Sequence, residues 1–110
     1  MLKLGTVRTV ELRSGSWSAG AVAWADTFWD RFIGLSHALS RDGVVLPVRS
    51  VHTLGMNAVD LVALDRDLVV VDTRRLGRNR VAWFAGAHYV LELPAGRPLP
   101  PPGAKIEVVG

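Results

Sequence analysis

The window Val51–Met56 brings together three side chains of different chemistry. His52 can donate a hydrogen bond, accept one or bind a metal near neutral pH, and Thr53 adds a hydroxyl group. Met56 adds a flexible apolar contact. Because Gly55 interrupts the expected strand and loops at strand ends present side chains to solvent, we predict a ligand-binding site formed by His52, Thr53 and Met56. The alternative is that His52 bonds only its own loop and Met56 fills the core.

An imidazole and a thioether in one window also suit a soft metal such as Cu(I). His52 and Met56 alone make a poor site, and the only other methionine is Met1, so His37 or His88 would have to join them. The chain has no cysteine, which excludes disulfides, thiolate metal sites and cysteine nucleophiles. We therefore predict no resident metal or cofactor, and a copper-binding protein is kept as an alternative function.

Two carboxylates are the best candidates for acid–base chemistry. Asp60 and Glu92 could act together in a small enzyme or a carbohydrate-active module, because two carboxylates in one cleft can divide the acid and base roles. The competing interpretation is structural: Arg31 is expected to bond backbone carbonyls or a carboxylate, with Asp60 and Glu92 as its leading partners. No pattern in the sequence pairs a nucleophile with a base and an orienting group, so we predict no catalytic residues.

The stretch Arg74–Gly86 combines arginines with a tryptophan. Four arginines between positions 74 and 80 could hold a phosphate or an acidic partner through bidentate contacts, or could simply form a solvated loop. Trp17 and Trp83, both in loop-like surroundings, could offer a stacking platform for a sugar or a base. We interpret the whole stretch as a long surface loop with room for one helical turn around Trp83 and Phe84.

Size, composition and charge narrow the class of protein. With 110 residues, 49% hydrophobic and 21% charged, the chain has the size and balance of one soluble folded domain spanning residues 1–110. A net charge of +3 is too small to indicate nucleic acid binding. No apolar run is long enough to span a membrane, and the N-terminus lacks the apolar region of a signal peptide, so the expected location is the cytoplasm. The expected partner is an unknown small ligand or a protein, and the oligomeric state stays open.

Short apolar stretches separated by turn residues predict a mostly β domain, a small sandwich or barrel of the jelly-roll kind with one or two short helices. The clearest pair is Val59–Leu64 with Leu68–Thr73, an antiparallel hairpin turned by Asp65-Arg66-Asp67 at the centre of the core, with both faces covered. The stretch Pro94–Gly103 predicts a stiff connector to the last strand. Further strands are expected at Leu2–Leu12, Gly20–Trp24, Val44–Leu46, Val51–Thr53, Tyr89–Leu93 and Ile106–Val109.

One segment departs from the β pattern. Phe28 and Phe32 lie four residues apart, as do Trp29 and Ile33, which places all of them on one helical stripe. We predict a short amphipathic helix over Asp26–Gly34 that packs on the sheet.

Four short motifs occur in the order found in one prokaryotic family, and their residues are Arg31-Phe32-Ile33-Gly34-Leu35, Ser50-Val51-His52-Thr53-Leu54-Gly55-Met56, Asp60-Leu61-Val62-Ala63-Leu64-Asp65 with Val69-Val70-Val71, and Val90-Leu91-Glu92-Leu93-Pro94-Ala95-Gly96. They resemble, in turn, that family's R-x-x-G-L motif, its S-V-H-T-x-G-M segment, its central hairpin and its V-L-E-L-P-A-G strand. From about Ala25 onward the chain therefore resembles the family catalogued as domain of unknown function 192.

The resemblance implies a compact β-sandwich or jelly-roll-like fold with short helices, and it implies no activity, because none is established for the family. The chain departs from the pattern in Asn57-Ala58-Val59, which is shorter than in relatives and lacks their Pro and Arg, and in Ala63, where an aromatic residue is usual. A site built on the missing basic residue is thus not expected here. We predict a non-catalytic binding or accessory module, with the carboxylate enzyme and the copper protein as alternatives.

Overall fold

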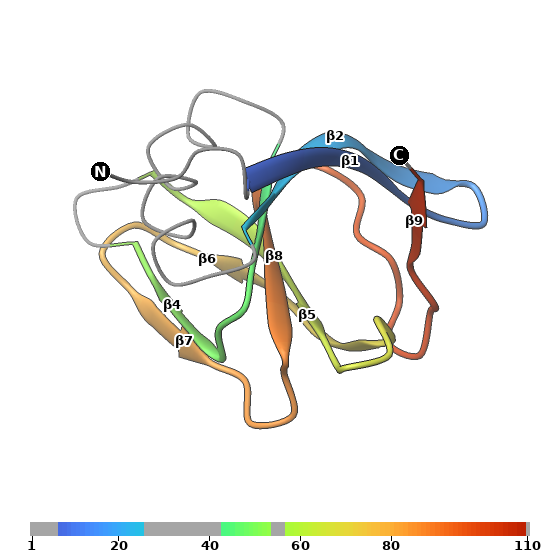
Figure 1. The fold of residues 1–110 in the computed structure, drawn as a ribbon. Helices are drawn as coiled ribbons and strands as arrows, with labels where there is room; N and C mark the ends of the chain where they lie inside the picture. Colours follow the sequence, from blue (N-terminus) through green and yellow to red (C-terminus); the bar gives the residue numbers. More distant parts are fainter. Residues whose placement is uncertain (1–6, 26–42, 54–56, 110) are drawn as a thin grey trace, which may run out of the picture.

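The computed structural model describes residues 7–25, 43–53 and 57–109, and the regular structure in these ranges is entirely β (Figure 1). The helix predicted over Asp26–Gly34 lies outside the described residues. The described strands are β1 (Val7–Ser14), β2 (Trp17–Ala25), β3 (Val44–Leu46), β4 (Ser50–His52), β5 (Val59–Leu64), β6 (Val70–Leu76), β7 (Val81–Trp83), β8 (Tyr89–Pro94) and β9 (Glu107–Val109).

Seven strands form one mixed sheet in the order β6-β5-β8-β3-β2-β1-β9, and β4 pairs with β7 in a second, two-stranded sheet. Within the large sheet only β2 and β3 run parallel. The sheet does not close into a barrel, because its outer strands β6 and β9 are not paired with each other. The connector before β9 nevertheless reaches the start of β6, where the Ile106 N–H donates to the Leu68 carbonyl and the Val70 N–H donates to the Ala104 carbonyl, both at 2.9 Å.

The antiparallel hairpin of β5 and β6 is confirmed, and β5 lies at the centre of the fold between β6 and β8. Every residue of β5 is buried, as its continuous apolar sequence predicted. The same expectation was wrong for β6, which is buried mainly at its two ends, because it is the outer strand of the sheet and carries arginines. Its turn is also longer than expected: the Asp65 carboxylate accepts the N–H groups of Asp67 (2.8 Å) and Val69 (3.0 Å), which delays the strand to Val70.

The larger part of the core lies on one face of the large sheet. There the hairpin of β1 and β2 packs over β5 and β8, and its members include Leu12, Val22, Val62 and Leu91, which are essentially inaccessible to solvent. Trp24 closes one side of this cluster, with its ring edge-on to Tyr89 at 5.1 Å between centroids.

The β4–β7 sheet covers the opposite face of β5 and β6. Val51 of β4, Ala82 of β7 and Phe84 pack against a second buried cluster that includes Leu61 and Val90 of the large sheet. Side chains from both sheets therefore share one core on this side.

The region interpreted as a loop, Arg74–Gly86, is the main correction to the sequence-based fold. It contains the end of β6 and all of β7, and no helical turn forms around Trp83 and Phe84. A tight turn at residues 77–80 makes this possible, because Asn79 adopts a left-handed backbone conformation (φ 57°) that asparagine tolerates well. Two strands thus fit where the density of arginines indicated a solvated loop.

The central position of β8 generates a stability prediction. Leu91→Ala removes a fully buried side chain between β5 and β3, and we expect it to lower the free energy of unfolding by about 2–5 kcal/mol. Urea unfolding followed by tryptophan fluorescence measures this. Val71→Ala, on the exposed face of β6, is the matched control and should change stability by less than about 1 kcal/mol; equal losses in the two variants would contradict the assignment of the core.

Candidate functional site

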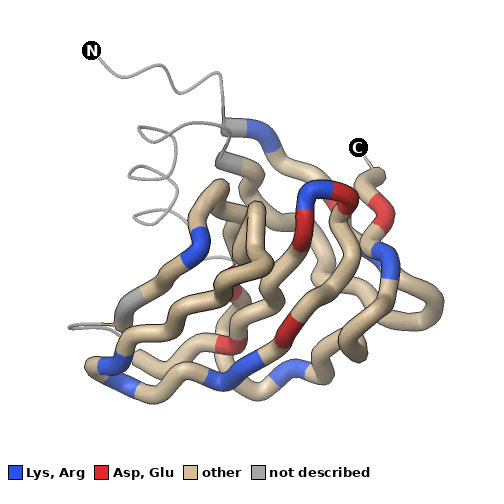
Figure 2. The backbone as a smooth tube through the Cα atoms, turned by 90° about the horizontal axis from the view of Figure 1, so that it is seen from below, with Lys and Arg blue, Asp and Glu red and all other residues tan. Residues whose placement is uncertain are grey.

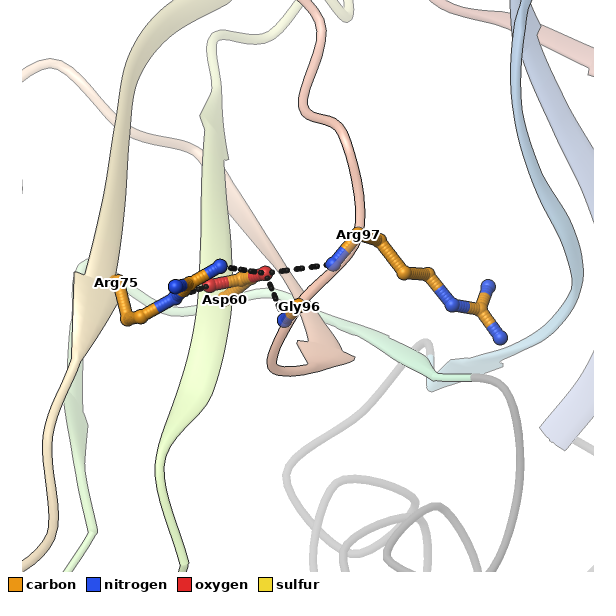
Figure 3. Close-up of polar contacts among 4 residues, drawn as sticks. All are labelled: Asp60, Arg75, Gly96 and Arg97. Carbon is orange, nitrogen blue, oxygen red and sulfur yellow. Dashed lines mark hydrogen bonds and ion pairs between the residues drawn. The ribbon is translucent and has the colours of Figure 1, made fainter.

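Asp60 is a buried charge with a complete set of hydrogen-bond donors (Figure 3). Its side chain, 0% exposed, lies on β5 between β6 and the turn that follows β8. On one side the Arg75 guanidinium donates through Nε to Oδ1 at 2.8 Å and through its terminal nitrogen to Oδ2 at 3.4 Å. On the other side the backbone N–H groups of Gly96 and Arg97 donate to Oδ2 at 2.9 and 3.3 Å.

These donors settle the charge state of Asp60. Burial alone raises the pKa of its carboxyl group, but the hydrogen bonds from Arg75 and Gly96, the positive charge of Arg75 and the bond from Arg97 outweigh burial and leave the pKa below its usual value. A carboxylate held ionised by four hydrogen bonds is a poor proton donor at neutral pH. Asp60 therefore joins β5, β6 and the turn after β8 rather than offering acid–base chemistry.

Arg97 extends this connection across the molecule. While its N–H group bonds Asp60, its guanidinium points the other way (Figure 3) and donates to the Ala19 carbonyl of β2 at 3.0 Å. The neighbouring Pro98 carbonyl accepts the indole N–H of Trp17 at 2.8 Å. The predicted connector is thus bonded to the central strands on one side and to the β1–β2 hairpin on the other.

Glu92 is the second buried acid, and it differs from Asp60 in its partners and in the direction of its pKa shift. It is 5% exposed, and its register partners in the neighbouring strands are the buried apolar residues Val44 and Leu61. Burial raises the pKa of its carboxyl group to about 7, with no compensating contact from the described residues. Near neutral pH this group can exchange a proton, but within the described part of the chain no nucleophile or orienting group stands beside it.

The register of β5 and β8 separates the two acids. Asp60 is opposite Leu93, whereas Glu92 is opposite Leu61, the residue after Asp60. Directly opposed residues share a face and successive residues alternate, so the two carboxyl groups point to opposite faces of the sheet. They do not share a cleft, and the pairing that the enzyme hypothesis needs is not formed.

Thr53, predicted as a ligand contact, is committed to the protein itself. Its side chain is 0% exposed, and its hydroxyl group donates to the Gly77 carbonyl at 2.5 Å and accepts the Arg80 N–H at 3.0 Å. Its backbone also pairs with Arg80 and Asn79. Thr53 therefore anchors the end of β4 to the turn between β6 and β7.

The structure describes only part of the other predicted site residues. The backbone of His52 ends β4 opposite Val81, whereas its side chain, Met56 and Arg31 lie outside what the structure describes. Among the described residues, no three His, Asp or Glu side chains gather in a way that could hold a metal ion. A ligand or copper site on His52 and Met56 stays a prediction.

The β4–β7 sheet carries an exposed surface built on a strand that the sequence analysis missed, although Trp83 itself was singled out there as a possible stacking residue. Val81 and Trp83 are 67% and 62% exposed, while Ala82 between them and Phe84 after them are buried. This out–in–out–in alternation is the period of a strand with one buried face, and it is readable in the sequence Val81-Ala82-Trp83-Phe84. The neighbouring arginines favoured the interpretation as a loop, so this strand alternation was not recognised.

The β4–β7 surface is bordered by arginines. Arg78 and Arg80 precede β7 and are exposed, and Arg49 precedes β4. Figure 2 shows several basic positions along the lower edge of the molecule and others at its top and right side. Arg74 and Arg75 are compensated, by Asp72 at 3.4 Å and by Asp60, but no ion pair to Arg78 or Arg80 forms within residues 7–25, 43–53 and 57–109.

Comparison with known proteins gives no further assignment. No family model matches the chain, and neither a curated protein nor a solved structure matches it. In the described ranges, no helix is long and apolar enough to cross a membrane.

The pKa of Glu92 predicts a stability that depends on pH. The unfolded chain ionises near the ordinary value of 4.5, whereas the folded chain holds its proton to about 7, so ionisation opposes folding. We expect the contribution of Glu92 to the free energy of unfolding to be fully present below pH 4.5 and to fall by about 3 kcal/mol as the pH rises to 7. Glu92→Gln should remove this decline.

Urea unfolding across that pH range measures the effect of Glu92. Glu11→Gln, at a half-exposed glutamate of β1 that pairs with Arg13, is the matched control and should keep the decline of the wild type. If the profiles of wild type and Glu92→Gln run parallel, the carboxyl group is not buried in the way described.

The bonding of Asp60 yields a further prediction. Asp60→Ala leaves the N–H groups of Gly96 and Arg97 without their acceptor, and we expect a loss of about 3 kcal/mol in unfolding free energy. Arg75→Ala should cost clearly less, because its guanidinium is exposed and screened by water. Chemical denaturation of both variants tests this: equal losses would mean that the ion pair, and not the backbone bonds, carries the stabilisation.

Proposed function

We propose that this domain is a non-catalytic binding module for a protein partner and that the outer face of the β4–β7 sheet is its binding surface. The observation that carries the proposal is the exposure of Val81 and Trp83, two residues apart on one short strand. Single exposed apolar residues are ordinary, but adjacent ones concentrate apolar area of the kind that marks protein contacts. Tryptophan is also among the residues that contribute most to binding free energy.

The firm attachment of the β7 backbone around Trp83 to the core supports a role in binding. Ala82 and Phe84, the residues on either side of it, are buried in the core shared by the two sheets. Thr53 fixes the turn that leads into β7 through its hydroxyl group. Because this backbone is already fixed in the fold, binding through Trp83 orders little additional backbone.

The two buried acids support binding over catalysis. Asp60 uses its oxygens within the fold, and Glu92 lies on the other face of the sheet beside apolar residues. The carboxylate enzyme therefore gains no support from the described geometry.

The proposal also covers the finer packing of the fold, the family and the location of the chain. The core shared by the β4–β7 sheet and the large sheet supports a small sandwich-like packing of the jelly-roll kind, with the predicted Asp26–Gly34 helix as a further element. The four sequence motifs support descent from the family catalogued as domain of unknown function 192, and a cytoplasmic location remains the expectation for the chain.

Selection of a random dodecapeptide library against the chain tests the proposed surface. We expect the enriched peptides to bind Trp83→Ala about tenfold more weakly than the wild type, because an exposed tryptophan at a contact centre is commonly worth that much. Val71→Ala, exposed on β6 in the large sheet, is the control and should bind them unchanged. Peptides that bind both variants alike, or no enrichment at all, would overturn the proposal; thermal denaturation checks that Trp83→Ala is folded.

A further inference from the structure

The outer edge of β7 carries backbone groups that no described strand pairs with. The Phe84 N–H donates to the Arg49 carbonyl at 2.8 Å, and the Thr53 N–H donates to the Arg80 carbonyl at 2.9 Å. Residues 80, 82 and 84 therefore direct their backbone groups toward β4. Because these directions alternate along a strand, the N–H and C=O groups of Val81 and Trp83 point away from β4.

That edge is open in the described part of the chain. The β4–β7 sheet has two strands, and β7 follows the lower left rim of the molecule in Figure 1. No hydrogen bond from the backbone of Val81 or Trp83 to another described residue is formed beyond the pairing with β4. An unpaired strand edge with exposed apolar side chains is a template for another strand.

The positive charge around β7 favours a negatively charged partner strand. From Thr73 to Leu91 the chain contains no acidic residue, while Arg78 and Arg80 stand at the start of β7. These two positive charges beside the edge repel a basic strand, including β7 of a second copy of the chain, and attract an acidic strand. The short length of β7 limits the pairing to a few residues.

We infer that the partner binds as an added strand: an extended acidic peptide segment pairs with the outer edge of β7 and makes the two-stranded sheet three-stranded. The N–H and C=O groups of Val81 and Trp83 supply the main-chain hydrogen bonds, and their side chains contact alternate residues of the segment. Arg78 and Arg80 contact its carboxylates. This inference rests on the proposed function and specifies the partner for the same surface.

The open edge favours a peptide over a nucleic acid. The C=O groups of Val81 and Trp83 need N–H donors at the spacing of a strand, which a peptide backbone supplies and a phosphate backbone does not. A single-stranded nucleic acid could stack on Trp83, but it would leave these carbonyls unpaired.

Nuclear magnetic resonance titration of the full chain tests the inference with defined probes. The first probe is a capped octapeptide that alternates glutamate and valine. The comparison probes are the same peptide with lysine in place of glutamate, the glutamate peptide N-methylated at every amide, and a short oligouridylate. We expect the glutamate peptide alone to bind, with the Val81 and Trp83 amide protons becoming protected from exchange.

Paired variants separate the backbone from the side chains. Val81→Pro removes an N–H group that faces away from β4, so the pairing with β4 is retained, while Val81→Thr keeps this group in a side chain of similar shape. We expect Val81→Pro to bind the glutamate peptide about tenfold more weakly than Val81→Thr. Arg80→Glu should weaken binding in low salt far more than Arg66→Glu, which reverses an exposed arginine in the β5–β6 turn.

Each other outcome overturns a defined part of the inference. Equal binding of the N-methylated peptide, or of Val81→Pro and Val81→Thr, overturns strand addition while leaving a Trp83-dependent surface in place. Equal binding of the lysine peptide overturns the acidic partner, and preferential binding of oligouridylate replaces a peptide with a nucleic acid. If the glutamate peptide does not bind although library peptides bind through Trp83, only this inference fails; if neither binds, the proposed function fails with it.

Discussion

The fold depends most on the burial of one ionised carboxylate. Asp60 stays charged in the interior because the turn after β8 supplies two N–H groups from one side and the sheet supplies the partly exposed guanidinium of Arg75 from the other. The same turn positions Arg97, whose guanidinium bonds β2. A connector without regular structure is thereby fixed against both halves of the large sheet, which explains how the sheet can bend back on itself without closing into a barrel.

The two faces of the central strands treat a buried carboxyl group differently. On the face of Asp60, hydrogen bonds and the charge of Arg75 offset the cost of burying the carboxylate, and the hairpin of β1 and β2 adds apolar cover. On the Glu92 side the carboxyl group has apolar register partners, and the β4–β7 sheet covers the neighbouring strands. That small sheet has a buried inner face and an exposed outer one. Asp60 is thus satisfied within the fold, whereas Glu92 has no such partners among the described residues, and the small sheet leaves an apolar, arginine-bordered surface outside.

The local sequence pattern predicted the strands well where an apolar run was not mixed with charged residues. β3 and β5 begin and end at the predicted residues, because continuous Val and Leu between turn residues leave little choice. β7 was missed because its three residues follow four arginines, and charge was taken as a sign of a loop although the alternation of Val81, Ala82 and Trp83 was present. The separation of Asp60 from Glu92 was beyond local pattern, since it depends on the register between β5 and β8. Thr53 was chosen for its hydroxyl, and only the neighbouring turn shows that this hydroxyl is occupied.

The pairing of β1 with β9 has a consequence for synthesis of the protein on the ribosome. Glu11 is opposite Val109, so the first described strand meets its outer neighbour only after the roughly one hundred residues between them have been synthesised. Until then the β1–β2 hairpin carries an unpaired edge, and its apolar face lacks β8, which also comes late in the chain. Native contacts of such long sequence separation form slowly. The β1–β2 hairpin can therefore form early from neighbouring residues, but its outer edge and its apolar face are covered only once β8 and β9 have been synthesised.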